Sequence, residues 1–263
     1  MSRSVCNECL WYESEASVGP LAPDLVLFPP AGSGPSIFRG FSVKNTGCRI
    51  HVASLPGRGR RFDETPVRDW ERLVEELVGH LEDLVGDTVV LFGHSMGAIV
   101  AFEVARRLSV PPVALFAAGA GAPVAAGSPV REQRWSQLTD VEFVRQLSEI
   151  GGTPREVLAS AELLEFMMPA LRADFELVDT YRFVGGGVLS CPVFVLGGDE
   201  DATVTADDLA GWSTHTTAST SVTMFPGDHF FVQSAVGEVA NLLRRNIRSI
   251  VLRGEGSVVE QRG

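Results

Sequence analysis

The stretch TVVLFGHSMGAIVAFEVARRL at residues 88–108 decides the fold prediction for this chain. An apolar run is followed by GHSMG at 93–97 and then by a helix-like stretch that ends before Pro111. Glycines two residues either side of Ser95 remove the Cβ atoms that would collide in a sharp strand-to-helix turn. We therefore predict that Ser95 lies in a strained turn with an exposed hydroxyl, where the positive end of the helix dipole can stabilise negative charge.

Similar apolar runs recur along the chain and predict short buried strands. The runs are LVLF at 25–28, RIHVASL at 49–55, TVVLF at 88–92, PVALFAA at 112–118, PVFVLG at 192–197 and SVTMF at 221–225. Between them, residues 67–85 have helical period, with Trp70, Leu73, Leu77, Leu81 and Leu84 on one stripe. This alternation predicts a single α/β domain over residues 1–263, with a mostly parallel central sheet flanked by helices.

Residues 123–183 break the alternation. They contain the helical pieces TDVEFVRQLSEIG and SAELLEFMMPALRADFELVDTYRF and no convincing strand. We predict an inserted helical lid subdomain across the carboxyl edge of the sheet, where α/β proteins bind ligands; two additional outer-layer helices are the alternative. The polar or Gly-rich ends, 1–20 and 254–263, are expected to be irregular.

Composition excludes several classes of function. The net charge of -11 argues against nucleic acid as a partner, because phosphate binding requires a basic surface. No apolar run approaches the roughly 18 residues that span a bilayer, and the first residues show no signal-peptide pattern, so we expect a cytoplasmic protein without a membrane contact. Cysteines at 6, 9, 48 and 191 lack the second CxxC pair of a structural zinc site, and we expect reduced thiols and no metal.

A serine nucleophile needs a histidine to take its proton and an acid to orient that histidine. In a fold of this kind the chain order is Ser, acid, His, and only His215 and His229 follow Ser95 at sufficient distance. His229, in MFPGDHFF after a predicted strand, is the better candidate. His215 lies in WSTHTTAST and is expected to be a solvated loop residue.

The acid should come from the turn after PVFVLG, where GGDEDATVT offers Asp199, Glu200 and Asp201. The residues alone do not choose among the three. An oxyanion hole needs two backbone N–H donors, and Met96 supplies the first. Ala31, in LVLFPPAGSG after an early strand, is the predicted second donor, because the preceding prolines have no N–H.

Six segments together resemble the type II (editing) thioesterases of polyketide and nonribosomal peptide synthases, members of the α/β-hydrolase superfamily. They are LFPPAGSG, LPGRGRRFDE, LFGHSMGAIVAFEVARRL, MMPALRADFELVDTYRF, PVFVLGGDEDATVT and FPGDHFF. The resemblance implies that Asp201 is the triad acid, that His229 is the histidine, and that a phosphopantetheine tunnel runs beneath the helical lid. The chain departs from many relatives at Pro30 and Ala202, neither of which is a catalytic group.

The resemblance implies a serine thioesterase that removes acyl groups from the phosphopantetheine arm of an acyl or peptidyl carrier protein through an acyl-serine intermediate. Such an enzyme edits stalled or mis-primed synthases in polyketide and antibiotic biosynthesis, needs no cofactor, and is expected to be a monomer. A carboxylesterase, an acyltransferase and a non-catalytic carrier-binding module are the alternatives. Arg58, Arg60 and Arg61 form the densest basic cluster and are predicted to dock an acidic carrier protein.

Overall fold

The computed structural model describes residues 11–15, 19, 22–124, 134–153 and 155–260, without the side chains of residues 15, 155 and 253–260. Within this part of the chain, one sheet of seven strands has the order β1-β3-β2-β4-β5-β6-β7. The strands are β1 (Tyr12–Glu15), β2 (Asp24–Phe28), β3 (Arg49–Ala53), β4 (Val89–His94), β5 (Ala114–Ala118), β6 (Val193–Gly198) and β7 (Thr220–Phe225). The six predicted strands are confirmed and are mutually parallel.

The expectation of an irregular start is wrong for Tyr12–Glu15, which pairs antiparallel with β3 at the sheet edge. Its sequence, YESE, is short and mostly polar, as edge strands often are. Tyr12 is buried and donates a hydrogen bond to the carbonyl of Leu77. A prediction of strands from runs of apolar residues therefore misses this strand.

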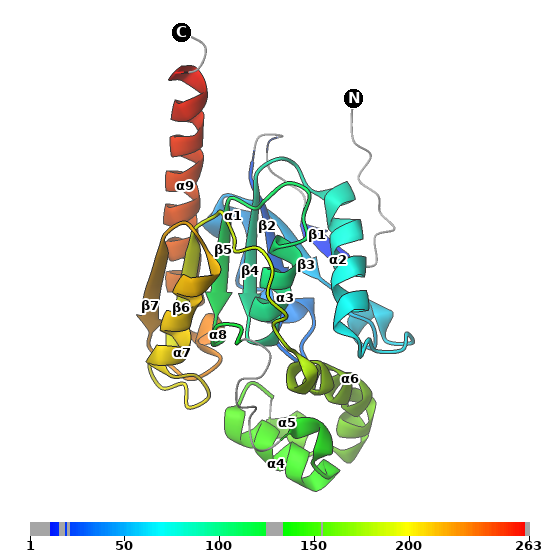
Figure 1. The fold of residues 1–263 in the computed structure, drawn as a ribbon. Coiled ribbons are helices and arrows are strands. Elements are labelled where there is room, and N and C mark those ends of the chain that lie inside the picture. The colour runs from blue at the N-terminus through cyan, green and yellow to red at the C-terminus, as the bar shows by residue number, and fades with distance from the viewer. Residues whose placement is uncertain (1–10, 16–18, 20–21, 125–133, 154, 261–263) are drawn as a thin grey trace.

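Helices cover both faces of the sheet (Figure 1). On one face, α2 (Trp70–Leu84) and α3 (Met96–Ala105) pack into one core cluster. On the other, α1 (Val43–Thr46), α8 (Phe231–Ser234) and α9 (Val236–Glu260) pack over a second cluster rich in phenylalanine. The predicted stripe of α2 is confirmed, since Leu73, Leu77 and Leu81 are fully buried.

The end of the chain also differs from expectation, because α9 continues as far as Glu260. Shorter elements connect the rest: η1 (Pro35–Phe38), η2 (Gly59–Arg61), α7 (Ala206–Ala210) and η4 (Gly211–His215). None of the helices within the described residues has the combined length and apolar character that crossing a membrane requires.

Four further elements form what we call the cap: η3 (Trp135–Gln137), α4 (Asp140–Ile150), α5 (Arg155–Leu158) and α6 (Ala161–Thr180). Figure 1 shows these helices beyond the carboxyl ends of the central strands, apart from the layers that cover the sheet. The cap has an apolar cluster of its own, built from Trp135, Leu138, Phe143, Leu147 and Leu171. The same helices present residues to the cavity described below.

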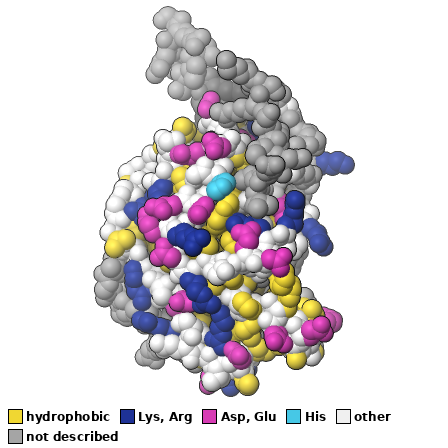
Figure 2. Space-filling view, turned by 90° about the vertical axis from the view of Figure 1, so that its right-hand side faces the viewer, with side chains coloured by type: hydrophobic (Ala, Val, Ile, Leu, Met, Phe, Trp, Pro, Cys, Tyr) yellow, Lys and Arg dark blue, Asp and Glu magenta, His cyan; other side chains and the backbone are white. Residues whose placement is uncertain are grey.

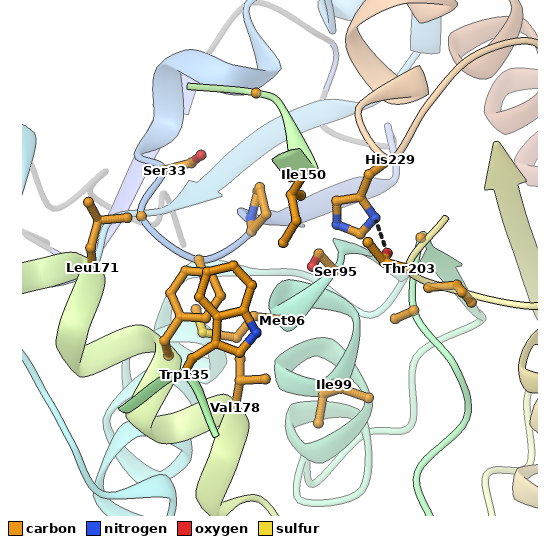
Figure 3. Close-up of a pocket in the computed structure, with 18 of the residues that line it drawn as sticks. Ser33, Ser95, Met96, Ile99, Trp135, Ile150, Leu171, Val178, Thr203 and His229 are labelled. Atoms are coloured by element: carbon orange, nitrogen blue, oxygen red, sulfur yellow. Dashed lines mark hydrogen bonds between the residues drawn. The ribbon is translucent and has the colours of Figure 1, made fainter. Parts of the chain in front are cut away.

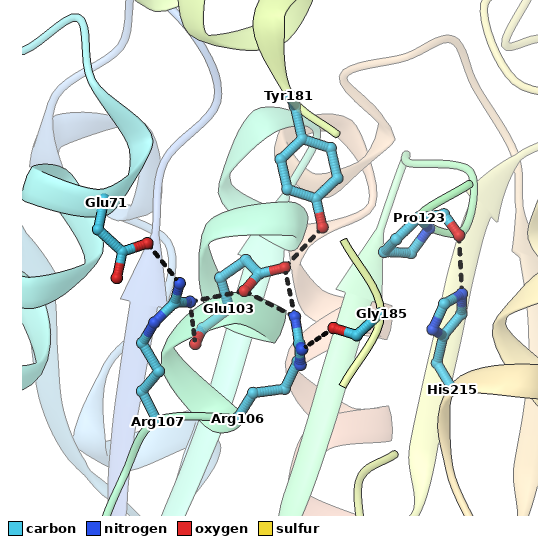
Figure 4. Close-up of polar contacts among 8 residues, drawn as sticks. All are labelled: Glu71, Glu103, Arg106, Arg107, Pro123, Tyr181, Gly185 and His215. Atoms are coloured by element: carbon cyan, nitrogen blue, oxygen red, sulfur yellow. Dashed lines mark hydrogen bonds and ion pairs between the residues drawn. The ribbon is translucent and has the colours of Figure 1, made fainter. Parts of the chain in front are cut away.

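Polar contacts hold the segment that follows the cap and the loop after β5 on the core (Figure 4). After α6, the Tyr181 hydroxyl donates a 2.7 Å hydrogen bond to the buried carboxylate of Glu103 on α3, which also binds Arg106 and Arg107. Burial and the adjacent Glu103 carboxylate raise the pKa of Tyr181, so its hydroxyl remains a donor. Glu103 thus joins the end of the cap to α3.

In the loop that follows β5, the carbonyl of Pro123 accepts a 2.8 Å hydrogen bond from Nε2 of His215. The expectation that His215 is solvated is wrong: only 5% of it is exposed, and its ring contacts Phe102 and Phe183 edge-on. Burial lowers the pKa of His215. A polar sequence context did not reveal the aromatic residues from other segments that enclose this ring.

Candidate active site

Ser95 occupies the strained turn that the sequence predicts. Its φ of 55° and ψ of -122° make it the only non-glycine residue with positive φ in the described part of the chain. A Cβ on Gly93 would lie 2.0 Å from the carbonyl oxygen of Gly97, and one on Gly97 would lie 2.1 Å from that of Phe28. Both neighbours are backbone atoms that cannot move aside, so this turn requires its two glycines.

His229 and Asp201 come together at the carboxyl edge of the sheet, from the loops that follow β7 and β6. His229 Nδ1 lies 2.8 Å from Oδ2 of Asp201, and both groups are largely shielded from water. Burial by itself raises the pKa of Asp201, but the hydrogen bonds from His229 and Thr203 outweigh it and the net pKa is lowered. Asp201 is therefore an ionised partner that fixes the Nδ1–H tautomer of His229.

The two other acids of this turn do not contact His229. Asp199 accepts a 2.9 Å hydrogen bond from the amide of Gly227 and so braces the turn before the histidine. Glu200 is exposed, and its own amide donates to the carbonyl of Gly227. Of the three acids that the sequence offered, the structure therefore places Asp201 against His229.

Thr203 is a site residue that sequence reasoning missed. Its hydroxyl lies 2.6 Å from Oδ1 of Asp201 and 3.0 Å from Nδ1 of His229, and its amide also donates to Asp201. Thr205, two residues further on, is the N-cap of α7. No sequence signal distinguishes a capping threonine from one that binds an acid.

His94, inside the GHSMG segment, was also missed. It is fully buried, and its Nε2 donates a 2.8 Å hydrogen bond to the carbonyl of His229. Burial, reinforced by the charge of the neighbouring His229, lowers the pKa of His94 to about 3. His94 is therefore a neutral support that holds the backbone of His229 without placing a second positive charge beside it.

These groups open onto a cavity of about 880 Å³ between the sheet edge and the cap. Figure 3 shows Ser95 and His229 on one side of it, with Trp135, Leu171 and Val178 of the cap on another. The predicted oxyanion donors, Ala31 and Met96, also line this cavity. Its volume and mixed lining suit an extended acyl group better than a small polar molecule.

The structure brings Ser95 and His229 to one cavity wall, but their side chains share no hydrogen bond among the contacts of the described residues. Such a bond is often long in a free enzyme and tightens when substrate binds. The Asp201–His229 bond, by contrast, is fully formed.

A second Ser–His–Asp arrangement lies elsewhere in the fold. Ser14 Oγ is 2.8 Å from Nδ1 of His51, whose Nε2 is 2.9 Å from Oδ1 of Asp24. Asp24 begins β2, so its end of this hydrogen-bonded triplet lies at the amino ends of the parallel strands. Nε of Arg49 also lies 2.7 Å from Oδ1 of Asp24. None of these residues lines the cavity, which identifies the Ser95 side as the candidate active site.

The predicted docking cluster of arginines is wrong. Arg58 and Arg61 are 8% and 6% exposed, and they pair with Asp174 and Glu64, whereas Arg60 is exposed. On the face drawn in Figure 2, basic and acidic side chains are intermixed, and hydrophobic side chains gather over its lower part. Proximity in sequence did not reveal that two of the three charges turn inward.

A parallel sheet with a serine at a strand-to-helix turn, followed along the chain by an acid and a histidine, defines the α/β-hydrolase fold. The sequence model of the thioesterase domain family matches residues 23–247. The chain belongs to this thioesterase family and is a hydrolase that acts on thioester bonds. The expected fold class and the resemblance to type II thioesterases are both confirmed.

Two curated relatives and one solved structure illustrate the match. The gramicidin S biosynthesis protein GrsT of Aneurinibacillus migulanus is 34% identical over 235 residues, covering 86% of this chain and 90% of the relative. Thioesterase PikA5 of Streptomyces venezuelae is 32% identical, covering 88% and 82%. The structure of the type II thioesterase BorB from the borrelidin biosynthetic cluster is 31% identical, with a TM-score of 0.81 and coverage of 90% and 98%.

Proposed function

We propose that this enzyme hydrolyses acyl groups from the phosphopantetheine arm of acyl or peptidyl carrier proteins, and thereby clears stalled or mis-primed polyketide or nonribosomal peptide synthases. The names of its relatives support this setting, since they refer to gramicidin S and borrelidin biosynthesis. The observation that carries the chemistry is the Asp201–His229 hydrogen bond at the wall of the cavity that Ser95 also lines.

In the proposed reaction, Ser95 Oγ attacks the thioester carbonyl while Nε2 of His229 takes its proton. Asp201 holds the ring by Nδ1–H and stabilises the imidazolium. The amides of Ala31 and Met96 donate to the oxyanion. Collapse of the intermediate breaks the C–S bond, and His229 returns the proton to the leaving thiolate.

The acyl-serine that remains is then hydrolysed. Water attacks its carbonyl as His229 accepts a proton from the water, and the second tetrahedral intermediate expels Ser95 Oγ, which regains a proton from His229. The products are a free acid, a carrier thiol and the original enzyme. Every step uses side chains or backbone donors of the chain, so the proposal includes no cofactor.

In this proposal the cap acts as a lid subdomain over the acyl group. Trp135, Leu171 and Val178 give it an apolar surface toward the cavity, which suits an acyl chain, while the carrier protein itself stays outside. The slender phosphopantetheine arm then has to cross from the carrier to Ser95. The hydrogen bond from Tyr181 to Glu103 keeps the carboxyl end of the cap on the core during this step.

The test combines Ser95→Ala with Ser14→Ala as a matched control, since Ser14 also contacts a histidine. We expect wild-type enzyme and Ser14→Ala to release thiol from an acyl carrier protein over many turnovers and to react covalently with a fluorophosphonate. Ser95→Ala should do neither. Multiple turnovers by Ser95→Ala would reject the proposed nucleophile.

A substrate comparison tests the proposed substrate class. The value of kcat/KM should be higher for an acyl carrier protein than for the same acyl group on N-acetylcysteamine or as an ethyl ester. A preference for the ester would favour a carboxylesterase instead. Transfer of the acyl group to an added alcohol or amine in place of water would favour an acyltransferase.

A further inference from the structure

A buried ion pair joins the cap to the turn after β3. Asp174 of α6 is 1% exposed and Arg58 is 8% exposed. The guanidinium binds the carboxylate through both ends, with Nη1 to Oδ2 at 2.5 Å and Nη2 to Oδ1 at 2.7 Å. This bidentate geometry fixes the relative orientation of the two side chains as well as their distance, which a single hydrogen bond does not.

The same pair holds the loop after β2 on both sides. The amide of Gly32 donates a 2.7 Å hydrogen bond to Oδ2 of Asp174, and Nη1 of Arg58 donates to the carbonyl of Ser33 at 3.2 Å. The negative partner of the ion pair therefore binds the amide of Gly32, and the positive partner binds the carbonyl of Ser33. Ala31, the proposed second oxyanion donor, directly precedes Gly32.

Packing against α6 adds a steric constraint at the same point. Gly32 has a φ of +74°, and a Cβ there would lie 2.2 Å from Cδ2 of Leu171. Leu171 and Asp174 are three residues apart and so lie on the same face of α6. One face of a cap helix thus sets both the position and the backbone conformation of the loop.

We propose that Asp174 and Arg58 are positioning residues that hold the Ala31 amide in place for the oxyanion. This inference rests on the proposed function, in which that amide stabilises the tetrahedral intermediates. Such donors are effective because they are already oriented before charge develops, and a displacement of about 1 Å can cost roughly 100-fold in rate. Because the acid belongs to the cap, a shift of α6 also shifts the donor.

The first test measures catalysis in Asp174→Asn and Arg58→Lys, the second of which keeps the charge but not the bidentate geometry. We expect kcat for an acyl carrier substrate to fall roughly 10-fold to 100-fold, with KM changed less than about 3-fold. Affinity for an alkyl trifluoromethyl ketone, which forms a tetrahedral adduct with Ser95, should fall in parallel. Affinity for the free acid product should not.

Arg61→Met is the matched control. Arg61 is equally buried and comes from the same turn, but it binds Glu64 and the carbonyl of Ser54 and does not contact the loop. We expect this variant to lower the unfolding temperature while kcat and ketone affinity stay at wild-type values. An equal loss of kcat in Arg61→Met would mean that general destabilisation, and not positioning, explains the effect.

Deuterium exchange of the segment 31–34 separates this inference from the proposed function, because it needs no substrate. Exchange should accelerate in folded Asp174→Asn and Arg58→Lys but not in Arg61→Met. If Ser95→Ala stays active while exchange behaves as expected, the proposed nucleophile is wrong. The inference that Asp174 and Arg58 position the loop is then still supported. Wild-type kcat and ketone affinity in folded Arg58→Lys and Asp174→Asn, or wild-type exchange, would overturn the inference; if Asp174→Asn does not fold, Arg58→Lys decides.

Discussion

The hydroxyl of Thr203 donates a 2.6 Å hydrogen bond to Oδ1 of Asp201, while Oδ2 of the same carboxylate binds His229. The amide of Thr203 also donates to Oδ1, so both carboxylate oxygens are bound and the acid cannot rotate without breaking these bonds. A hydrogen bond to a charged group contributes about 1.5–3 kcal/mol. Thr203 thus holds the acid in the orientation that the histidine requires.

Thr203→Val should lower kcat on an acyl thioester by roughly 10-fold, because Oδ1 of Asp201 loses one of its two hydrogen bonds and keeps only the one from the Thr203 amide. Thr203→Ser keeps the hydroxyl and should restore most of the rate. Steady-state kinetics of the two variants provide the measurement. A serine variant as slow as the valine variant would point to loss of packing by the methyl group instead.

Asp201→Asn should reduce kcat by about 10³ to 10⁴, because an amide cannot hold His229 in the same tautomer or stabilise its protonated form. Asp199→Asn is the matched control from the same turn, since Asp199 binds only the amide of Gly227 among the contacts described above. We expect this control to lose less than about 3-fold in kcat. Comparable losses in the two variants would contradict the choice of Asp201.

Gly97→Ala should prevent accumulation of folded protein, because the added methyl group would lie 2.1 Å from the carbonyl oxygen of Phe28. Gly79→Ala provides the control, since nothing lies within 4 Å of its added methyl and it is inside α2. Alanine there should raise stability by about 0.5–1 kcal/mol. Thermal unfolding of both variants gives the measurement; a well-folded, active Gly97→Ala enzyme would contradict the structure of the turn.

His94 should make the enzyme less stable in acid. Its pKa is lowered to about 3 by burial and by His229, whereas in an unfolded chain the pKa keeps its ordinary value of 6.5. Between these values the unfolded state binds a proton that the folded state does not, so stability falls as pH is lowered from 6.5 toward 3. The contribution is at most about 1.4 kcal/mol per pH unit.

The His94→Gln variant checks this dependence, because glutamine can donate to the carbonyl of His229 but does not titrate. Urea unfolding at several pH values from about 7 to 4 should give a shallower loss of stability in the variant than in the wild type. Parallel slopes would show that other groups govern acid sensitivity.

Tyr181→Phe should lower the free energy of unfolding by about 1.5–3 kcal/mol, because a buried hydrogen bond to the Glu103 carboxylate is lost. Glu71→Gln is the comparison, since Glu71 binds Arg107 at 63% side-chain exposure and such pairs contribute little. Chemical denaturation measures both. A larger loss in Glu71→Gln would contradict the assignment of Glu103 as the main attachment of the cap's end.

The strands and the serine turn could be predicted from sequence because their signals are local. Strands buried on both faces read as apolar runs, and all residues of β2, β4 and β5 are buried. Tyr12–Glu15 was missed because edge strands are often short and carry charged residues, so that they give no apolar run. The same local reasoning identified the turn that contains Ser95.

The parts that could not be predicted depend on contacts between distant segments. Asp199, Glu200 and Asp201 all carry a carboxylate that could orient a histidine. Only the path of the turn decides which of them reaches His229. Arg58 was taken for a surface charge because its partner, Asp174, is 116 residues away. Residue type and spacing do not encode such pairings.

The chain formed by Ser14, His51 and Asp24 has a consequence for recognising enzymes by geometry. A search by residue type and proximity would also find these three residues, although none of them lines the cavity that Ser95 and His229 share. These three residues therefore provide a comparison for the site at Ser95 within the same molecule. What distinguishes Ser95 from Ser14 is its surroundings, namely the strained turn that it occupies and the cavity that it lines, and not the presence of a nearby histidine and acid.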